Sequence, residues 1–139
     1  GASAVLSSAV GERRVQFSEF FAGVTKTVLK PGEWLERIEV PAASAGARGA
    51  YKKLKRIAGH DLGIVGVLMV KGPMGLRFGV SSAAPTPVLV SSVAESDTPE
   101  AAAAKVLAAV SPISDVRGTK EYREHMIGVY VRRLLAEVK

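Results

Sequence analysis

The sequence from residue 62 to residue 80 reads LGIVGVLMVKGPMGLRFGV, and this stretch decides the fold. Leu62 to Val70 is apolar at both odd and even positions, as in a strand that needs cover on both faces. Lys71-Gly72-Pro73 predicts a turn. Beyond it, the even-numbered residues from Met74 to Val80 are apolar and alternate with glycine and arginine, which indicates a strand with one buried face. Strands joined by so short a turn pair antiparallel, so the stretch predicts the centre of an antiparallel sheet.

Two helices are predicted to follow this sheet. Asp97-Thr98 can supply the cap and Pro99 the first turn of a helix that runs through Ala101 to Val110. Thr119 can cap the second helix. Its apolar residues recur at helical spacing and predict one buried stripe: Tyr122, Met126, Val129, Tyr130 and Leu134. An antiparallel sheet of three to four strands packed on C-terminal helices is an α+β two-layer sandwich.

The N-terminal residues predict a β-hairpin that continues another lobe. Ala4–Ala9 and Arg14–Phe17 are short strand-like runs on either side of a Gly11-Glu12 turn. A hairpin is only weakly stable by itself, so this one should belong to a larger sheet. Residues 1–17 are therefore expected to end a preceding lobe, and residues 18–139 to form the domain that follows it.

Aromatic residues mark the next segment. Ser18 is expected to cap a short helical turn that includes Phe20 and Phe21. Trp34 is expected to begin a half-buried strand that Pro41 ends. The three aromatic side chains are interpreted as core anchors, because a binder of single-stranded nucleic acid interleaves more aromatics with basic residues than this chain, at 6% aromatic, provides.

Composition narrows the possible functions. The chain has 139 residues, of which 47% are hydrophobic and 23% charged, values typical of a globular domain. Its net charge of +6 suits an acidic partner, a phosphate-rich cofactor or nucleic acid. The absence of cysteine excludes disulfides, thiolate metal sites and a cysteine nucleophile. Because no targeting or membrane-spanning segment is recognised, a cytoplasmic location is expected.

No catalytic or metal-binding motif stands out. The sequence lacks the glycine-rich loops of Walker and dinucleotide type and the G-x-S-x-G elbow of hydrolases. His60 and His125 lie far apart without ligand spacing, so no metal site is predicted. Asp115 and Arg117, in a polar segment before the last helix, are interpreted as a local ion pair at a helix cap.

A basic run is the main candidate for a binding site. It places four positive charges within five residues, directly after Tyr51: Lys52, Lys53, Lys55 and Arg56. On a strand, these side chains would project alternately to both faces. One interpretation is a solvated edge whose charges pair with acids such as Asp61. The other is an anion site, for example for a cofactor pyrophosphate or the edge of a flavin.

A series of short motifs covers nearly the whole chain. They are Glu19–Gly23, Lys26-Thr27, Pro31–Glu33, Ile38–Pro41, Tyr51–Arg56, Asp61–Val65, Ala84–Pro87, Ser114–Thr119 and Tyr122-Arg123. In their order and spacing, the chain resembles the C-terminal domain of the FAD-binding medium subunit of molybdenum hydroxylases, the xanthine dehydrogenase and carbon monoxide dehydrogenase flavoprotein family. Two positions depart from the family pattern: Lys55-Arg56 replaces the usual arginine pair, and Gly59-His60 precedes Asp61.

The resemblance implies the two-layer sandwich of the CO dehydrogenase flavoprotein C-terminal domain, with residues 1–17 as the end of a preceding FAD-binding lobe. It also implies a domain that closes one edge of the flavin site and docks partner subunits while electrons pass from iron–sulfur clusters to FAD. By position, Leu35 matches a residue that contacts the flavin and Lys52 matches a lysine near it. Lys53 is a second candidate for that lysine.

The cofactors and partners follow from the same resemblance. FAD would be held mainly by N-terminal lobes that this chain lacks. Molybdopterin would belong to a large subunit and the 2Fe-2S clusters to a small iron–sulfur subunit. This chain would be part of an oxidoreductase and is not expected to be catalytic alone. Neither a membrane nor nucleic acid is an expected partner.

Two other functions remain open on the sequence alone. The first is a stand-alone basic module that binds nucleic acid or another polyanion through residues 52–56 and Arg132-Arg133. Its affinity would fall steeply with salt, by roughly one unit of logarithmic slope per phosphate contact. The second is an interaction domain that has kept the fold but binds no cofactor.

Overall fold

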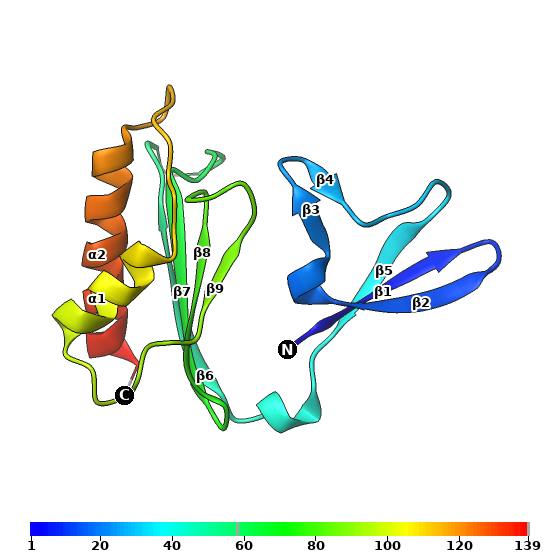
Figure 1. The fold of residues 1–139 in the computed structure, drawn as a ribbon, viewed down its shortest axis with the longest axis horizontal. Coiled ribbons are helices and arrows are strands. Elements are labelled where there is room, and N and C mark those ends of the chain that lie inside the picture. Colours follow the sequence, from blue (N-terminus) through cyan, green and yellow to red (C-terminus); the bar gives the residue numbers. More distant parts are fainter. Residues whose placement is uncertain (58, 139) are drawn as a thin grey trace. The chain divides into compact units, whose positions relative to one another are not determined.

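The computed structural model describes residues 1–57 and 59–138, and the chain divides into two compact units, Gly1–Ala45 and Gly46–Lys139 (Figure 1). Each unit has a hydrophobic cluster of its own. The sequence predicted a different boundary, after residue 17, where a preceding lobe was expected to end. That boundary remains a prediction.

The first unit is built on a three-stranded antiparallel sheet of order β2-β1-β5. Its strands are β1 (Ser3–Ser8), β2 (Gly11–Gln16) and β5 (Trp34–Glu39). Shorter elements are the 3-10 turns η1 (Phe17–Glu19) and η2 (Ala42–Ser44) and the paired strands β3 (Phe21–Gly23) and β4 (Lys26–Thr27). The N-terminal hairpin is confirmed, and β5 completes the larger sheet that it was expected to need.

Phenylalanine side chains cover one face of this sheet. Ala4 and Leu6 of β1 are buried there together with Phe20. Phe17 stacks on Phe20 with ring centroids 5.6 Å apart, and Phe21 meets both rings edge-on. The interpretation of Phe20 as a core anchor is therefore confirmed.

Two expectations for the first unit are wrong. The segment around Ser18 does not continue as a helical turn, because Phe21 pairs with Thr27 in the β3–β4 ladder. Nor is β5 half-buried: five of its six residues are exposed, and Trp34 is 54% exposed rather than a core anchor. β5 is an edge strand, and the phenylalanine cluster covers its neighbour β1 instead.

The second unit is the two-layer sandwich that the sequence predicts. Its antiparallel sheet has the order β6-β7-β8-β9, formed by β6 (Arg48–Leu54), β7 (Val65–Gly72), β8 (Gly75–Ser81) and β9 (Val88–Val90). Both helices, α1 (Pro99–Ala108) and α2 (Lys120–Glu137), lie on the same side of this sheet (Figure 1). One face of the sheet is thereby covered by helices, and we call the opposite face the outer face.

The two central strands supply most of the sheet side of the core. Their helix-facing residues are buried: Val65, Val67 and Met69 of β7 and Leu76, Phe78 and Val80 of β8. The helices contribute Ala102, Ala103, Val106, Ile127, Val131 and Leu134. Burying one large apolar side chain stabilises a fold by about 1.5–3 kcal/mol. The stretch at residues 62–80 therefore fixes both the antiparallel pairing and the surface on which the helices pack.

Capping residues define where the helices begin, as predicted. The hydroxyls of Thr98 and Thr119 accept hydrogen bonds, both 3.2 Å long, from the backbone N–H groups of Ala101 and Tyr122. The predicted stripe of α2 needs correction at its start, since Tyr122 is 46% exposed. The buried residues of α2 are Arg123, Ile127, Gly128, Tyr130, Val131 and Leu134. The stripe was misplaced because it opens on an arginine, which a search for apolar residues passes over.

Candidate functional site

The basic run begins on β6, an edge strand that ends at Leu54, and continues into the turn that follows. Its two candidate lysines, both on β6, point to opposite faces of the sheet. Lys52 is on the helix side, where its Nζ pairs with Glu137 Oε2 of α2 at 2.5 Å. Lys53 is on the outer face, where its Nζ donates to the carbonyl oxygen of Asp61 at 3.4 Å. Its aliphatic stem passes over Gly63, at which a Cβ would meet Lys53 Cε at 3.0 Å. The Lys52 ammonium thus pairs with a carboxylate, whereas the Lys53 ammonium contacts a backbone carbonyl.

The outer face carries a row of exposed apolar side chains across the sheet. Tyr51, Leu68, Gly79 and Leu89 are register partners on the four successive strands. Tyr51 is 54%, Leu68 40% and Leu89 59% exposed. Within the described part of the second unit, no element covers this row. The sequence prediction that β7 needs cover on both faces is thus met on one face only.

A glycine shapes one end of the outer face. Gly66 of β7 pairs with Lys53 on one side and Ser81 on the other. A Cβ at Gly66 would come within 2.3 Å of the Tyr51 hydroxyl oxygen and 2.6 Å of Ser81 Oγ. The two hydroxyl groups therefore occupy the space that a larger residue would fill. We call Lys53, Gly66 and Ser81, with the Tyr51 hydroxyl, the hydroxyl end of the outer face.

The turn that follows β6 is organised by Asp61. Its carboxylate accepts hydrogen bonds from the backbone N–H groups of Arg56 (2.8 Å) and Ile57 (3.4 Å) and lies 3.6 Å from the Arg56 guanidinium. The backbone hydrogen bond from Arg56 is the main cause that lowers the pKa of Asp61. Lys55 Nζ donates to the carbonyl oxygen of Gly59 at 3.0 Å. The predicted pairing of the basic run with Asp61 is confirmed for Arg56.

Leu35 lies in the first unit, apart in sequence from both lysines. It is on β5 opposite Leu6 and is 37% exposed. The pairing shifts register at the next residue, Glu36, whose carboxylate accepts a hydrogen bond from the Ser7 hydroxyl. Ile38, 49% exposed, pairs with Ala4. Leu35 and Ile38 therefore form an open apolar surface on the side of β5 that continues the phenylalanine cluster.

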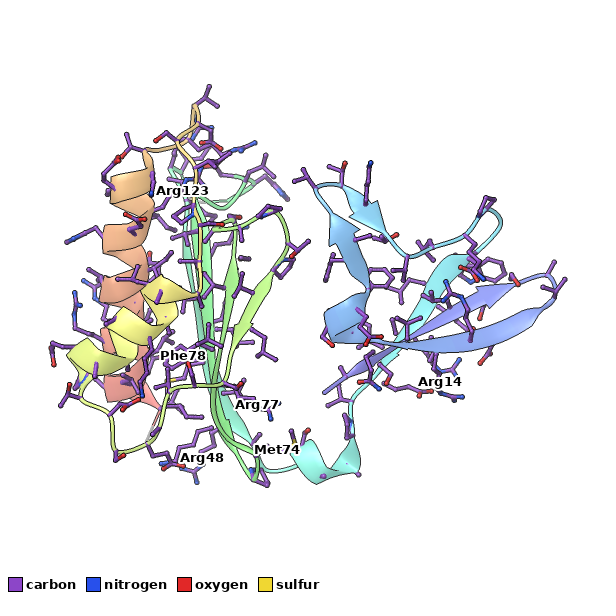
Figure 2. All side chains as sticks on the ribbon, viewed as in Figure 1. Arg14, Arg48, Met74, Arg77, Phe78 and Arg123 are labelled. Atoms are coloured by element: carbon purple, nitrogen blue, oxygen red, sulfur yellow. The ribbon has the colours of Figure 1, made fainter. Side chains whose placement is uncertain are left out.

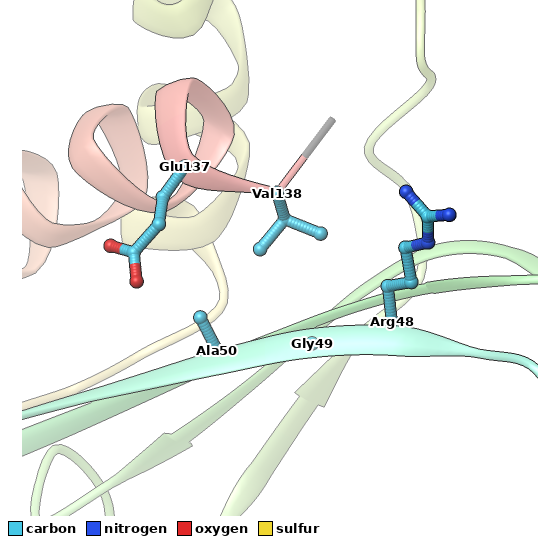
Figure 3. A pocket seen from close by; sticks show the side chains of 5 residues that line it. All are labelled: Arg48, Gly49, Ala50, Glu137 and Val138. Atoms are coloured by element: carbon cyan, nitrogen blue, oxygen red, sulfur yellow. The ribbon is translucent and has the colours of Figure 1, made fainter.

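A shallow pocket of about 350 Å³ lies between β6 and the C-terminal end of α2 (Figure 3). Its lining residues are Arg48, Gly49, Ala50, Glu137 and Val138. A second pocket, of about 340 Å³, shares Arg48 and extends to Lys71 and Glu95, which are paired at 2.9 Å. None of the three predicted site residues lines either pocket.

The polar segment before α2 forms a charge cluster with the buried Arg123 of α2, and the sequence predicted this cluster only in part. The Asp115–Arg117 pair is present at 3.0 Å. Asp115 also accepts a hydrogen bond of 2.6 Å from Arg123 Nη2. Arg123 is 3% exposed, and its Nη1 donates to the carbonyl oxygens of Ile64 (2.7 Å) and Ser82 (2.9 Å). These contacts join α2 to the sheet, which is a structural role.

Residues 1–57 and 59–138 contain no group of three or more His, Cys, Asp or Glu side chains arranged to hold a metal ion. Over the same residues, no helix has both the length and the apolar character that crossing a bilayer requires.

Residues 49–138 match the family described as the CO dehydrogenase flavoprotein C-terminal domain. The chain belongs to this family. This chain is 32% identical over 152 residues to the carbon monoxide dehydrogenase medium chain of Afipia carboxidovorans, with 100% of this chain and 52% of the relative covered. It is 31% identical over 150 residues to the glyceraldehyde dehydrogenase medium chain of Sulfolobus acidocaldarius, covering 99% and 53%.

Solved structures confirm the fold of this chain. It superposes on a chain of a Cu,Mo-CO dehydrogenase in its cyanide-inactivated form with a TM-score of 0.83 and 32% identity, covering 98% of this chain and 52% of the other. A chain of quinoline 2-oxidoreductase from Pseudomonas putida 86, at 20% identity, gives a TM-score of 0.81 and shares the fold. The chain spans about half the length of the curated relatives that it matches.

Proposed function

We propose that this chain is the C-terminal part of the FAD subunit of a molybdopterin-dependent dehydrogenase or hydroxylase. In that subunit it closes one edge of the flavin site and docks partner subunits during electron transfer from iron–sulfur clusters to FAD. Membership of the CO dehydrogenase flavoprotein family and the likeness to medium chains over the whole length of this chain support the proposal. The observation that carries it is the uncovered outer face, with its apolar row beside Lys53.

The residues of the hydroxyl end fit the edge of a flat heterocycle. Tyr51 offers apolar surface to a ring face, and the Lys53 ammonium and the Ser81 hydroxyl can donate hydrogen bonds to ring oxygen and nitrogen atoms. When bound, FAD supplies the acceptor for electrons and passes them onward. The part of this chain is to exclude water from one edge of the ring and to hold a positive charge near it.

The two lysines are expected to contribute unequally. Lys53 lies on the outer face, and among residues 1–57 and 59–138 its ammonium contacts only a backbone carbonyl, at 3.4 Å, so its charge is available to a ligand. Lys52 pairs with Glu137 and supports the flavin site through the position of β6. Leu35, exposed on β5, is proposed as a separate apolar contact from the first unit.

Flavin fluorescence titration of the complete subunit tests these assignments. Lys53→Ala is expected to raise the Kd for FAD about tenfold, equivalent to roughly 1.4 kcal/mol. Lys52→Ala, the matched control on the same strand, should raise it less, and Leu35→Ala should weaken binding without changing its salt dependence. A complete subunit that binds no FAD would overturn the proposed function itself.

Partners and location complete the proposal. The names of the relatives, medium chains of carbon monoxide and glyceraldehyde dehydrogenases, favour a complex with a large molybdopterin subunit and a small 2Fe-2S subunit. Residues 1–17 would end a preceding FAD-binding lobe, and the complex would be cytoplasmic. A polyanion-binding function is less favoured, because acidic groups of the chain itself already pair with Lys52 and Arg56.

A further inference from the structure

Arg77 lies on the outer face at the end opposite the hydroxyl end. It is a β8 residue that pairs with Val70 of β7, and Val70 pairs in turn with Gly49 of β6. Figure 2 shows Arg77 on the side of the sheet away from the helices, whereas its neighbour Phe78 points toward them. Ser81 is four positions after Arg77 on β8, which places the two ends about 13 Å apart along the strand. We call Arg77, Val70 and Gly49 the arginine end.

The guanidinium of Arg77 lacks a partner in the part of the chain that the structure describes. Its Nε is buried and makes no hydrogen bond there, and Arg77 forms no ion pair with residues 1–57 or 59–138. A buried N–H donor without an acceptor is unfavourable, and native folds rarely leave one. Several other cations of this unit pair with acids, as Lys71 does with Glu95 and Lys105 with Asp97. Because Nε is closed to solvent, the donors left for an anion are the two Nη groups of Arg77, which also make no hydrogen bond with residues 1–57 or 59–138.

The surroundings of Arg77 specify what kind of anion fits. The outward residues of the four strands contain two cations and no carboxylate: Gly49, Tyr51, Lys53, Gly66, Leu68, Val70, Arg77, Gly79, Ser81 and Leu89. Leu68 and Leu89 stand exposed in the neighbouring row. A ligand that satisfies both features must combine a carboxylate with apolar surface.

We propose that the arginine end docks a polypeptide segment in which an Asp or Glu carboxylate binds Arg77 while apolar side chains cover Leu68 and Leu89. A guanidinium pairs with a carboxylate through two parallel hydrogen bonds, and such a pair is strong where water is excluded. Alternating acidic and apolar residues in the segment would present both features to one face. The inference specifies the docking role proposed above, and it does not depend on a flavin contact by Lys53.

Two other occupants fit less well. A second copy of this chain would bring Arg77 and Lys53 against like charges, and three exposed side chains offer far less than the roughly 800 Å² per partner of a stable interface. A small anion would satisfy Arg77 but leave Leu68 and Leu89 in water.

Nitrogen-15 NMR of the chain tests the proposal with a defined probe, the peptide acetyl-Leu-Glu-Leu-Glu-Leu-amide. We expect saturable shifts of the Arg77 Nε–H signal and of the backbone amides of Leu68 and Leu89 at millimolar peptide. The matched peptide with Gln in place of Glu should bind about tenfold more weakly, since it lacks the charge. The Arg77→Lys variant should lose most of the preference for the Glu peptide, because an ammonium cannot form the two parallel hydrogen bonds of a guanidinium. The Arg132→Ala variant, which removes an exposed charge from α2, should bind both peptides as the unchanged chain does.

Three results would overturn the proposal. The first is no saturable shift at Arg77 with the Glu peptide. The second is an equal shift with acetate alone, which would mean a bare anion site. The third is shifts that depend on protein concentration without peptide, which would mean a second copy. FAD binding by the complete subunit is measured separately, so failure here leaves the flavin assignment untouched.

Discussion

At the scale of single residues, Arg123 joins parts of the second unit that are far apart in sequence. Its guanidinium reaches the carbonyl of Ile64, 59 residues away, the carbonyl of Ser82, 41 residues away, and the carboxylate of Asp115. The sequence predicted the pair of Asp115 with Arg117 because both lie in one polar segment. The carbonyls of Ile64 and Ser82 lie just before β7 and just after β8. Their positions near Arg123 depend on how the whole sheet folds, so a local sequence pattern does not predict these contacts.

Removing this guanidinium should destabilise the protein strongly. Arg123→Ala leaves a partly buried carboxylate and two carbonyls without their donor, and such losses cost about 3–5 kcal/mol. The unfolding free energy from urea denaturation measures the effect. Arg117→Ala is the control, because its side chain is 35% exposed and an exposed pair contributes up to about 1 kcal/mol. Equal losses for the two variants would show that Arg123 does not hold the fold together as described.

The outer face offers a second comparison between single residues. Gly66→Ala would force the Tyr51 hydroxyl or Ser81 to move, and overpacking of this kind costs about 1–3 kcal/mol. Gly79→Ala is the matched control, because a Cβ there meets Leu68 at an ordinary 3.7 Å. Thermal unfolding should therefore show a lower Tm for Gly66→Ala only. A similar Tm for both variants would mean that the two hydroxyl groups do not occupy this space.

At the scale of elements, the strands and helices of the second unit follow from sequence patterns, and β5 shows where such patterns fail. Its alternation of apolar and charged residues predicted a half-buried strand. Instead Arg37 pairs with Glu12 of β2 at 3.2 Å and with Glu39 at 3.0 Å, above the fully buried Val5 of β1. The charged side of β5 thus covers β1, while its apolar side stays open. Alternation alone cannot tell which side of a strand the fold covers.

Ion pairs of the first unit make its stability depend on pH. The Arg13 guanidinium binds Glu33 at 2.7 Å, and this hydrogen bond is the main cause that lowers the pKa of Glu33 from 4.5 to about 2. A carboxyl whose pKa is lower in the folded state stabilises the fold above its unfolded pKa and loses that contribution as pH falls. The contribution of Glu33 should therefore be complete above pH 4.5 and be lost between pH 4.5 and about 2.

Glu33→Gln isolates this contribution from that of other carboxylates. The Tm difference between the natural chain and the variant, followed by circular dichroism, should be largest near neutral pH and shrink below pH 4.5. A difference that stays constant down to pH 2 would contradict the assigned role of Arg13.

At the scale of the whole molecule, the sequence predicted the two-layer sandwich and the family, because the motifs that carry them extend over the matched residues 49–138. It did not predict that β5 closes a separate unit, Gly1–Ala45, with a core of its own. That division rests on pairing between β1 and β5, which are far apart in sequence. The sequence located the basic run as a candidate site but did not show which of its lysines lies on the outer face. Strand pairing determines that, and it places Lys53 there.

We propose that the second unit closes one edge of a flavin site. Iodide quenching of flavin fluorescence measures how accessible the bound ring is to dissolved ions. It can be compared between the complete subunit and a variant that lacks residues 46–139. Our account predicts that the deletion leaves FAD bound more weakly and its fluorescence markedly more accessible to iodide. Equal quenching and an unchanged Kd for FAD would contradict it.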